Sequence, residues 1–263
     1  MSGDLTVGAL RSVARYGPFF EVQLPQPDSA AHKPSPQPSS APRWRPLSEL
    51  SHATTVRNRV SRARALLCER LGLPASAVTP RVTGSIVLLG LAARLIAPTF
   101  GVATQGGAVR PLLAADLQWQ DVDGGPLPLR YRPQTPRGEP GREPVPVPLP
   151  ATALVSQLFD EFLTPLQLRF ETEYRLSRRI VLGNIASAVA GAAQAIARAE
   201  PSQARRAAEL ATAMLKSGPL AGTAEARSPD SPDWAIRRRS CCLSYMLPGT
   251  GLCADCVLVP GVR

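Results

Sequence analysis

The sequence predicts an α+β fold that is mainly helical: a helical platform with a small antiparallel β element and a cysteine-rich C-terminal tail. Apolar residues recur with helical spacing over 47–71, 82–96 and 166–199. Short alternating runs bounded by turn residues appear between 112 and 149. Four of the five cysteines lie within the sixteen residues 241–256. A chain of 263 residues can bury a sizeable core as one large or two small domains.

Composition and charge limit the partners. The net charge of +10 is compatible with nucleic acid, an acidic membrane surface or an anionic ligand. No stretch interleaves basic with stacking aromatic residues, and no helix-turn-helix, zinc-finger or RNP pattern occurs, so we expect no nucleic-acid partner. Residues 1–18 contain no apolar core of signal-peptide length.

The most apolar run, residues 82–98, is interrupted by Arg94 and is shorter than the ~20 residues of a membrane span. We therefore expect no stable membrane insertion and a cytoplasmic location, with a peripheral position at the inner membrane face left open. In a reducing cytosol, clustered thiols favour metal binding over disulfides.

The N-terminal part, residues 1–24, should contain a helix over 3–16 followed by a short extended piece over 19–24. Gly17-Pro18 separates the two, because neither residue continues a helix easily. Residues 25–46 hold seven prolines and several serines, which is typical of a linker or surface loop.

A mainly helical domain is expected over residues 47–230. Its first helix, 47–71, has an apolar stripe and five arginines mostly off that stripe, at 57, 59, 62, 64 and 70. Those arginines indicate either a solvated face or an anion-binding face. Cys68 lies beside the stripe and is interpreted as a buried small apolar residue. The next helix, 82–96, should end near Pro98 and lead into a glycine-rich loop over 100–109.

The small β insert is expected near residues 112–149. Residues 117–120 and 127–131 alternate around Asp123-Gly124-Gly125, which predicts a hairpin, and residues 145–149 read as an edge strand at best. Helices should follow over about 151–163, 166–199 and 201–216. Small residues at 187, 188, 191 and 192 allow close packing against a neighbouring helix.

The C-terminal segment, residues 231–263, carries the pattern Cys-Cys-x10-Cys-x2-Cys. Four thiolates complete the ligand shell of tetrahedral zinc or of an iron–sulfur cluster. Cys253 and Cys256 form a normal hook, whereas the adjacent pair Cys241-Cys242 chelates one small ion awkwardly. A [2Fe–2S] cluster spreads its ligands over two irons, which relaxes this demand.

Two glycines between the cysteine pairs, Gly249 and Gly251, have two interpretations. Their backbone N–H groups can approach the sulfurs and raise a cluster's reduction potential, or the glycines serve turn geometry alone.

At these residues the sequence resembles a known family. The stretches 238–243 and 252–258 are similar to the C-terminal signature of the FhuF-like ferric-siderophore reductases. Residues 179–184 resemble the family's segment ending in Gly-Asn, although Leu182 stands where an aromatic residue often precedes the glycine. The order of the N-terminal elements fits actinobacterial members. The resemblance implies a [2Fe–2S] cluster in residues 231–263, held by Cys241, Cys242, Cys253 and Cys256.

The resemblance further implies one-electron reduction of a ferric siderophore, of hydroxamate or other type, with no catalytic residue beyond the cluster. Arg237, Arg238 and Arg239 would offset the cluster's negative charge or steer an anionic chelate; a solvated basic run is the alternative. No nucleotide-binding fingerprint occurs, so electrons must come from a donor that the sequence does not identify.

Two other functions remain open at this point. One is a non-enzymatic metal-binding module in which zinc or a structural cluster pins the tail to the helices. The other is an iron–sulfur electron carrier or redox sensor that never contacts a siderophore. Neither a Gly-x-Ser-x-Gly nor a His-Glu-x-x-His motif is present, which argues against hydrolase chemistry.

Overall fold

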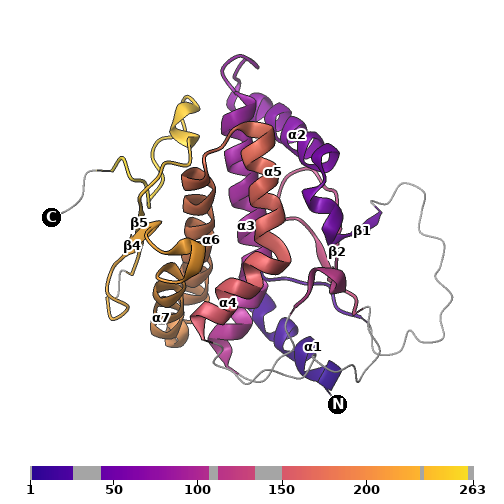
Figure 1. Ribbon diagram of the computed structural model, residues 1–263, viewed down its shortest axis with the longest axis vertical. Helices are drawn as coiled ribbons and strands as arrows, with labels where there is room; N and C mark the ends of the chain where they lie inside the picture. Colours follow the sequence, from indigo (N-terminus) through magenta and orange to yellow (C-terminus); the bar gives the residue numbers. More distant parts are fainter. Residues whose placement is uncertain (1, 26–42, 107–111, 134–149, 232–233, 260–263) are drawn as a thin grey trace.

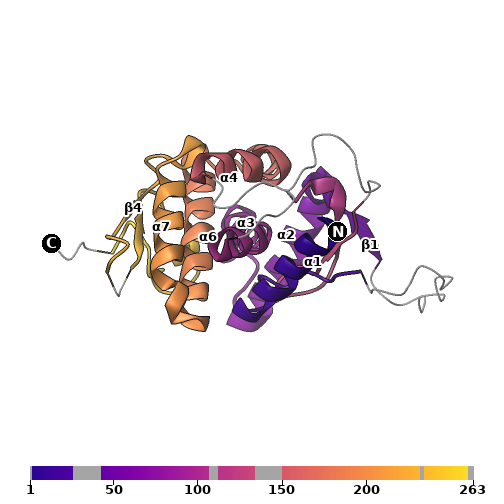
Figure 2. The ribbon, with the colours of Figure 1, turned by 90° about the horizontal axis from the view of Figure 1, so that it is seen from below.

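The computed structural model describes residues 2–25, 43–106, 112–133, 150–231 and 234–259. It is 61% helical, with a few antiparallel strands in small sheets, as the sequence predicts. Figure 1 shows the three-stranded sheet on one side of the central helix α3, and the C-terminal segment on the other side, next to α6. Figure 2 shows α3 between α6 and α7 on one side and α1 and α2 on the other.

The centre of the molecule is the pair α3 (Pro80–Gln105) and α6 (Arg178–Ala199), which make the most extensive contact of any two elements described. Each begins at a hydroxyl cap: Thr79 accepts a hydrogen bond from Val82 N–H, and Ser177 accepts one from Ile180 N–H. The helices run parallel, so their N-terminal turns lie at the same end of the core. Small residues of α6 allow the close approach.

The predicted end of the second helix near Pro98 is wrong. The helix α3 continues through Pro98 to Gln105, and residues 95–104 are all buried. A proline inside a helix removes one backbone hydrogen bond, but burying this apolar turn against the core outweighs that loss. The expected loop over 100–109 is therefore helical as far as Gln105.

The predicted long helix over 166–199 is also divided. The helix α5 (Thr164–Tyr174) ends where Arg175 adopts the left-handed conformation, with φ of 49°. Leu176 is buried at the corner, and Ser177 then starts α6. Before α5, α4 (Ala151–Leu158) and a π-helical turn (Phe159–Leu163) occupy the expected helical stretch. After α6 follow a short 3₁₀ turn (Pro201–Gln203) and α7 (Ala204–Leu215).

The N-terminal helices agree with the sequence. The helix α1 (Ser2–Val13) and a 3₁₀ turn (Ala14–Tyr16) pack Leu10, Val13 and Tyr16 into the core. A 3₁₀ turn (Leu47–Ser51) leads into α2 (Ala53–Leu71), which ends at Gly72 in the left-handed conformation. The arginines of α2 do not form a freely solvated face, because Arg57, Arg59 and Arg62 each pair with an acidic side chain.

The first sheet has the strand order β1-β2-β3 and is antiparallel, with β1 (Trp44–Pro46), β2 (Leu117–Gln120) and β3 (Leu129–Tyr131). Trp119 lies opposite Arg45 on one neighbour and Leu129 on the other. The predicted hairpin is confirmed. The strand β1 corrects the expected linker over 25–46, whose last residues pair with β2. In the expected extended piece, Gln23 forms a parallel bridge with Arg130.

A second sheet, which the sequence did not predict, pairs β4 (Ala224–Ala226) with β5 (Ile236–Arg238) in antiparallel fashion. The strand β5 ends three residues before Cys241, the first of the four clustered cysteines. The possible edge strand at 145–149 falls outside the described residues.

Arg94 explains how a charged residue fits in the apolar part of α3. It is buried, and its guanidinium donates hydrogen bonds to the backbone carbonyls of Leu127 (2.5 Å), Phe19 (2.7 Å) and Glu21. Burial lowers the pKa of Arg94 to about 10. The residue ties α3 to the N-terminal segment and to the β2–β3 connection.

Two helices, α3 and α6, are long and apolar enough by length and composition to cross a membrane. The helix α3 is longer than the apolar run over 82–98 that the sequence shows. In each, 67% of the most apolar window is buried inside the protein. This burial is typical of core helices in a soluble protein.

Candidate metal centre

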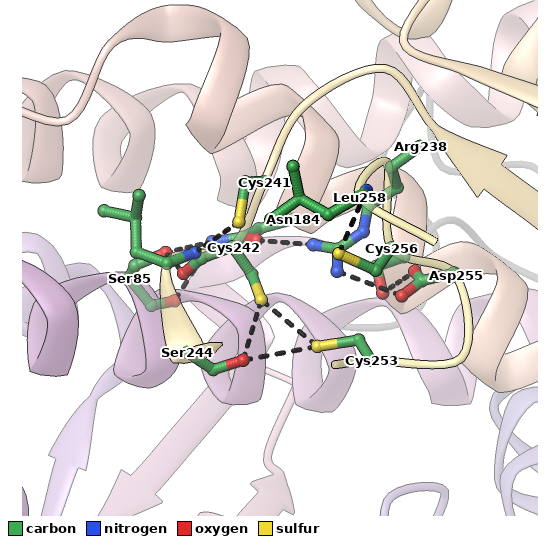
Figure 3. A network of polar contacts seen from close by, with 12 residues as sticks. Ser85, Asn184, Arg238, Cys241, Cys242, Ser244, Cys253, Asp255, Cys256 and Leu258 are labelled. Carbon is green, nitrogen blue, oxygen red and sulfur yellow. Dashed lines mark hydrogen bonds and ion pairs between the residues drawn. The ribbon is translucent and has the colours of Figure 1, made fainter. Parts of the chain in front are cut away.

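The four clustered cysteines lie together between β5 and residue 259. Cys242 and Cys256 are buried, with 3% and 2% exposure, while Cys241 and Cys253 are partly exposed. The sulfurs of Cys242 and Cys253 are 3.2 Å apart, and Figure 3 shows all four sulfurs in one neighbourhood. Cys68 lies apart from the other four cysteines and packs against a small apolar cluster formed by Val78, Val82 and Leu247, but it is only partly buried rather than buried as the sequence predicts.

A buried hydrogen-bond network joins the first cysteine pair to the central helices (Figure 3). The hydroxyl of Ser85 on α3 donates to the carbonyl oxygen of Cys242 at 2.7 Å. The amide of Asn184 on α6 donates to the Ser85 hydroxyl and carbonyl oxygens, at 2.8 and 3.0 Å. Asn184 is completely buried, and its carbonyl oxygen accepts from Arg238 at 3.1 Å. The polar groups are therefore satisfied by one another rather than by water.

The second cysteine pair is held through Asp255, which lies inside the Cys253-x2-Cys256 hook. Its carboxylate accepts from Arg238 at 3.0 Å and from the Ser187 hydroxyl on α6 at 2.5 Å. Its backbone oxygen accepts from the Arg238 N–H at 2.9 Å. Arg238 has a fully buried side chain, so it bridges the two halves of the cysteine motif from the protein side.

Gly183 explains the Gly-Asn segment on α6. A Cβ atom at this position would lie 1.9 Å from the hydroxyl oxygen of Ser240, the residue before Cys241. The absence of a side chain lets the cysteine segment pack directly on the helix. This contact also places Asn184 within reach of Arg238.

Two backbone N–H groups donate to cysteine sulfurs: Leu243 to Cys241 at 3.3 Å and Leu258 to Cys256 at 3.4 Å. Leu243 adopts the left-handed conformation, with φ of 70°, which turns the chain back over the sulfur. Gly249 and Gly251 also have positive φ, at 82° and 67°, so turn geometry accounts for these glycines. The hydrogen bonds to sulfur come from the leucines that follow the cysteines.

The pKa of the Cys242 thiol is lowered, in contrast to those of Cys241 and Cys253. Burial raises the pKa of Cys242, but hydrogen bonds from Ser244, from Cys253 and from the Arg238 guanidinium outweigh it and bring the pKa down to about 7. Burial raises the pKa of Cys241 and of Cys253. Cys242 is therefore deprotonated more easily than Cys241 or Cys253, and the thiolate is the form in which cysteine binds metals.

The three arginines before the cysteines have different surroundings. Arg237 is exposed and donates to the carbonyl oxygens of Val257 and Val259, at 3.2 and 3.0 Å. Arg239 is exposed and pairs with Glu225 at 3.0 Å. Arg238 is buried, so of the interpretations given for the three arginines its guanidinium fits the one that places positive charge beside the cysteines rather than a solvated basic run.

The residues present fit an iron–sulfur group by their chemistry. Four thiols lie together, and two buried donors beside them, Arg238 Nε and Ser240 Oγ, have no hydrogen-bond partner in the described structure. Donors of this kind stabilise thiolate and sulfide charge. Among the described residues, no three or more His, Cys, Asp or Glu side chains converge to hold a metal ion.

Sequence reasoning missed the supporting residues Ser85, Ser187 and Asp255. Ser85 and Ser187 are ordinary polar residues in the sequence, whereas Asp255 and Asn184 stood in segments with a recognisable signal that did not show what their side chains contact. Their roles depend on contacts across 68 to 157 residues of chain.

A comparison with protein families gives a match within the cysteine segment. Residues 238–258 match the family model of the FhuF 2Fe-2S C-terminal domain, and this range contains all four clustered cysteines and Arg238. A search of curated proteins found no match. The match supports a [2Fe–2S] cluster and makes this segment similar to the C-terminal domain of the FhuF family.

Proposed function

We propose that this protein reduces ferric siderophores by one-electron transfer from a [2Fe–2S] cluster held by Cys241, Cys242, Cys253 and Cys256. The observation that carries the proposal is the match over 238–258 to a 2Fe-2S domain model of the FhuF family. The geometry adds support, since both cysteine pairs are anchored to α3 and α6 while Cys241 and Cys253 are partly exposed. Partial exposure leaves a short route for an electron to a bound chelate.

When bound, a [2Fe–2S] cluster supplies one electron at a time. The protein's own residues supply the charge and the hydrogen-bond donors around the cysteines. The buried guanidinium of Arg238 places positive charge behind the cysteines, and the N–H groups of Leu243 and Leu258 point at two of the sulfurs. Both features favour the more negative reduced state and so raise the reduction potential.

The reaction transfers one electron to the chelate and forms no covalent bond to the protein. Ferric ion in the chelate accepts the electron and becomes ferrous ion, which binds hard oxygen ligands far more weakly and leaves. The electron must be restored by a separate donor, either another protein or a diffusible reductant. We place this cycle in the cytoplasm, without nucleic acid and without insertion into a membrane.

The test is a single-turnover reaction under anaerobic conditions. Protein reduced beforehand is mixed with a ferric siderophore and a ferrous-specific chelating dye. We expect the oxidised cluster spectrum to return while the dye captures an equal amount of ferrous ion. A cluster that stays reduced in excess chelate would instead identify an electron carrier or sensor.

A further inference from the structure

A cavity of about 220 Å³ lies between α2, α3 and the connection from β2 to β3. We call it the arginine cavity, after the three arginines of α2 that line it, Arg59, Arg62 and Arg70. The remaining wall is mostly apolar and comes from α2, from α3 and from the β2–β3 connection. Representative wall residues are Leu66, Leu67, Ile86, Val87, Leu91 and Leu127.

Positive charge exceeds negative charge around this cavity. Asp121 pairs with Arg59 at 2.7 Å and also with Arg62, which lies 3.6 Å from Asp123. No carboxylate pairs with Arg70 in the described part of the chain. Three guanidinium groups therefore face two carboxylates, and the buried Nε of Arg59 has no hydrogen-bond partner there. The surplus positive charge suits an anion.

The arginine cavity adjoins the cysteine segment through its wall. Leu67 and Ile86 line the cavity and also pack in the small apolar cluster that contains Leu247 and Leu243. Ser85, the neighbour of Ile86, donates to the carbonyl oxygen of Cys242. One layer of side chains thus separates a ligand in the cavity from the segment that carries the cysteines.

Phe19 extends the surface beyond the cavity. It is 37% exposed and lines both the arginine cavity and a groove of about 440 Å³ between α3 and α6. The groove is floored by small residues and includes Ser187, the partner of Asp255. A ligand larger than the cavity can therefore continue over Phe19 and still lie near the cysteine hook.

We propose that the arginine cavity seats the ferric chelate and selects anionic chelates, of catecholate or carboxylate type, over neutral or cationic hydroxamates. This inference rests on the proposed reductase function and names the substrate class for it. Arginine hydrogen-bonds the negative oxygens of the chelate, and the apolar wall accepts its rings or hydrocarbon arms. The electron then passes from the reduced cluster to the ferric ion, with no bond formed to the protein.

Gallium chelates test binding separately from reduction, because gallium(III) resembles ferric ion in its ligands and is not reduced. Isothermal titration calorimetry with the cluster-loaded protein would compare a gallium tricatecholate with a gallium trihydroxamate. We expect the tricatecholate to bind at least about tenfold more tightly, as removing charge-assisted hydrogen bonds generally costs that much. Its affinity should fall as salt is raised.

A space-filling variant locates the site. Gly90 lines the cavity, is exposed, and has open space where a Cβ would lie, with no atom within 4 Å, so Gly90→Leu adds a side chain at the cavity wall. The change also favours the helix, so folding should persist. Gly8→Leu is the matched control on α1, where a Cβ likewise meets no atom within 4 Å. We expect Gly90→Leu to weaken tricatecholate binding about tenfold or more, and Gly8→Leu to leave it unchanged.

A charge variant tests the selectivity. Arg70→Gln should weaken the tricatecholate about fivefold to tenfold and leave the trihydroxamate unaffected. Arg57→Gln, on the same helix but paired with Glu173 outside the cavity, is the control.

Equal binding of both gallium chelates, or binding insensitive to Gly90→Leu, overturns the inference. If Gly191→Leu in the α3–α6 groove abolishes binding while Gly90→Leu does not, the chelate occupies the groove instead. Either result would overturn the chelate site and leave the single-turnover reduction by the wild-type protein to be judged separately. Failure of the arginine-cavity proposal is therefore distinguishable from failure of the proposed reductase function.

Discussion

Asp255→Asn tests whether the docked cysteine hook keeps the metal centre together. The Arg238 side chain is fully buried and the Asp255 side chain is only 18% exposed, so the ion pair lies largely out of water. Asparagine keeps the shape but removes the negative charge that pairs with the buried guanidinium, whose other hydrogen-bonding partners include the Asn184 side chain. The Ser187 hydroxyl loses a charged acceptor as well.

The size of the effect follows from these contacts. Breaking a buried ion pair by removing one partner costs about 3–5 kcal/mol. Because asparagine still accepts one hydrogen bond, we expect a smaller loss than this range, about 2–3 kcal/mol. The population in which the hook has left α6 should then rise by about 30-fold to 160-fold.

The assay is the rate at which visible absorption of the cluster is lost in mild denaturant under anaerobic conditions. We expect Asp255→Asn to accelerate this loss by the same factor, since an undocked hook exposes its ligands. Asp230→Asn is the control: that carboxylate is 69% exposed and pairs with an exposed arginine, so its loss should have little effect. If the two variants lose their clusters at the same rate, the docking argument is refuted.

Three further predictions concern packing, burial and ligation. Gly183→Ala should lower the stability of the cluster-loaded protein by about 1–3 kcal/mol, because the new methyl group meets the Ser240 hydroxyl, and Ser240→Ala in the same chain should restore most of the loss in chemical denaturation. Arg94→Met should destabilise the fold by about 3 kcal/mol or more, because three backbone carbonyls lose their donor, whereas Arg81→Met on the exposed side of the same helix should change the denaturation midpoint little. Cys241→Ser should remove or alter the electron paramagnetic resonance signal of the reduced cluster; a normal signal would contradict the ligand assignment.

Much of the fold could be predicted from local pattern. Helical periodicity located α2, the first part of α3 and the helices after residue 150, because burial of one helix face leaves a repeat in the sequence. The hairpin of β2 and β3 was predicted from alternation around Asp123-Gly124-Gly125. The breaks were not predicted: Pro98 lies inside a helix, and Arg175 ends one, because packing overrides local preference at both positions.

One part of the candidate metal centre could likewise be predicted from the sequence, and the other part could not. The sequence by itself determined the cysteine spacing and its likeness to one iron–sulfur signature, because ligands that share a short segment leave a local pattern. Only the tertiary structure decided which residues hold that segment. Ser85 contacts Cys242 across 157 residues of chain, Asn184 contacts Ser85 across 99, and Asp255 contacts Ser187 across 68. Contacts between residues so far apart leave no periodic pattern in the sequence. Burial likewise separated Arg238, which supports the cysteines from within, from its two exposed neighbours in an otherwise uniform run of arginines.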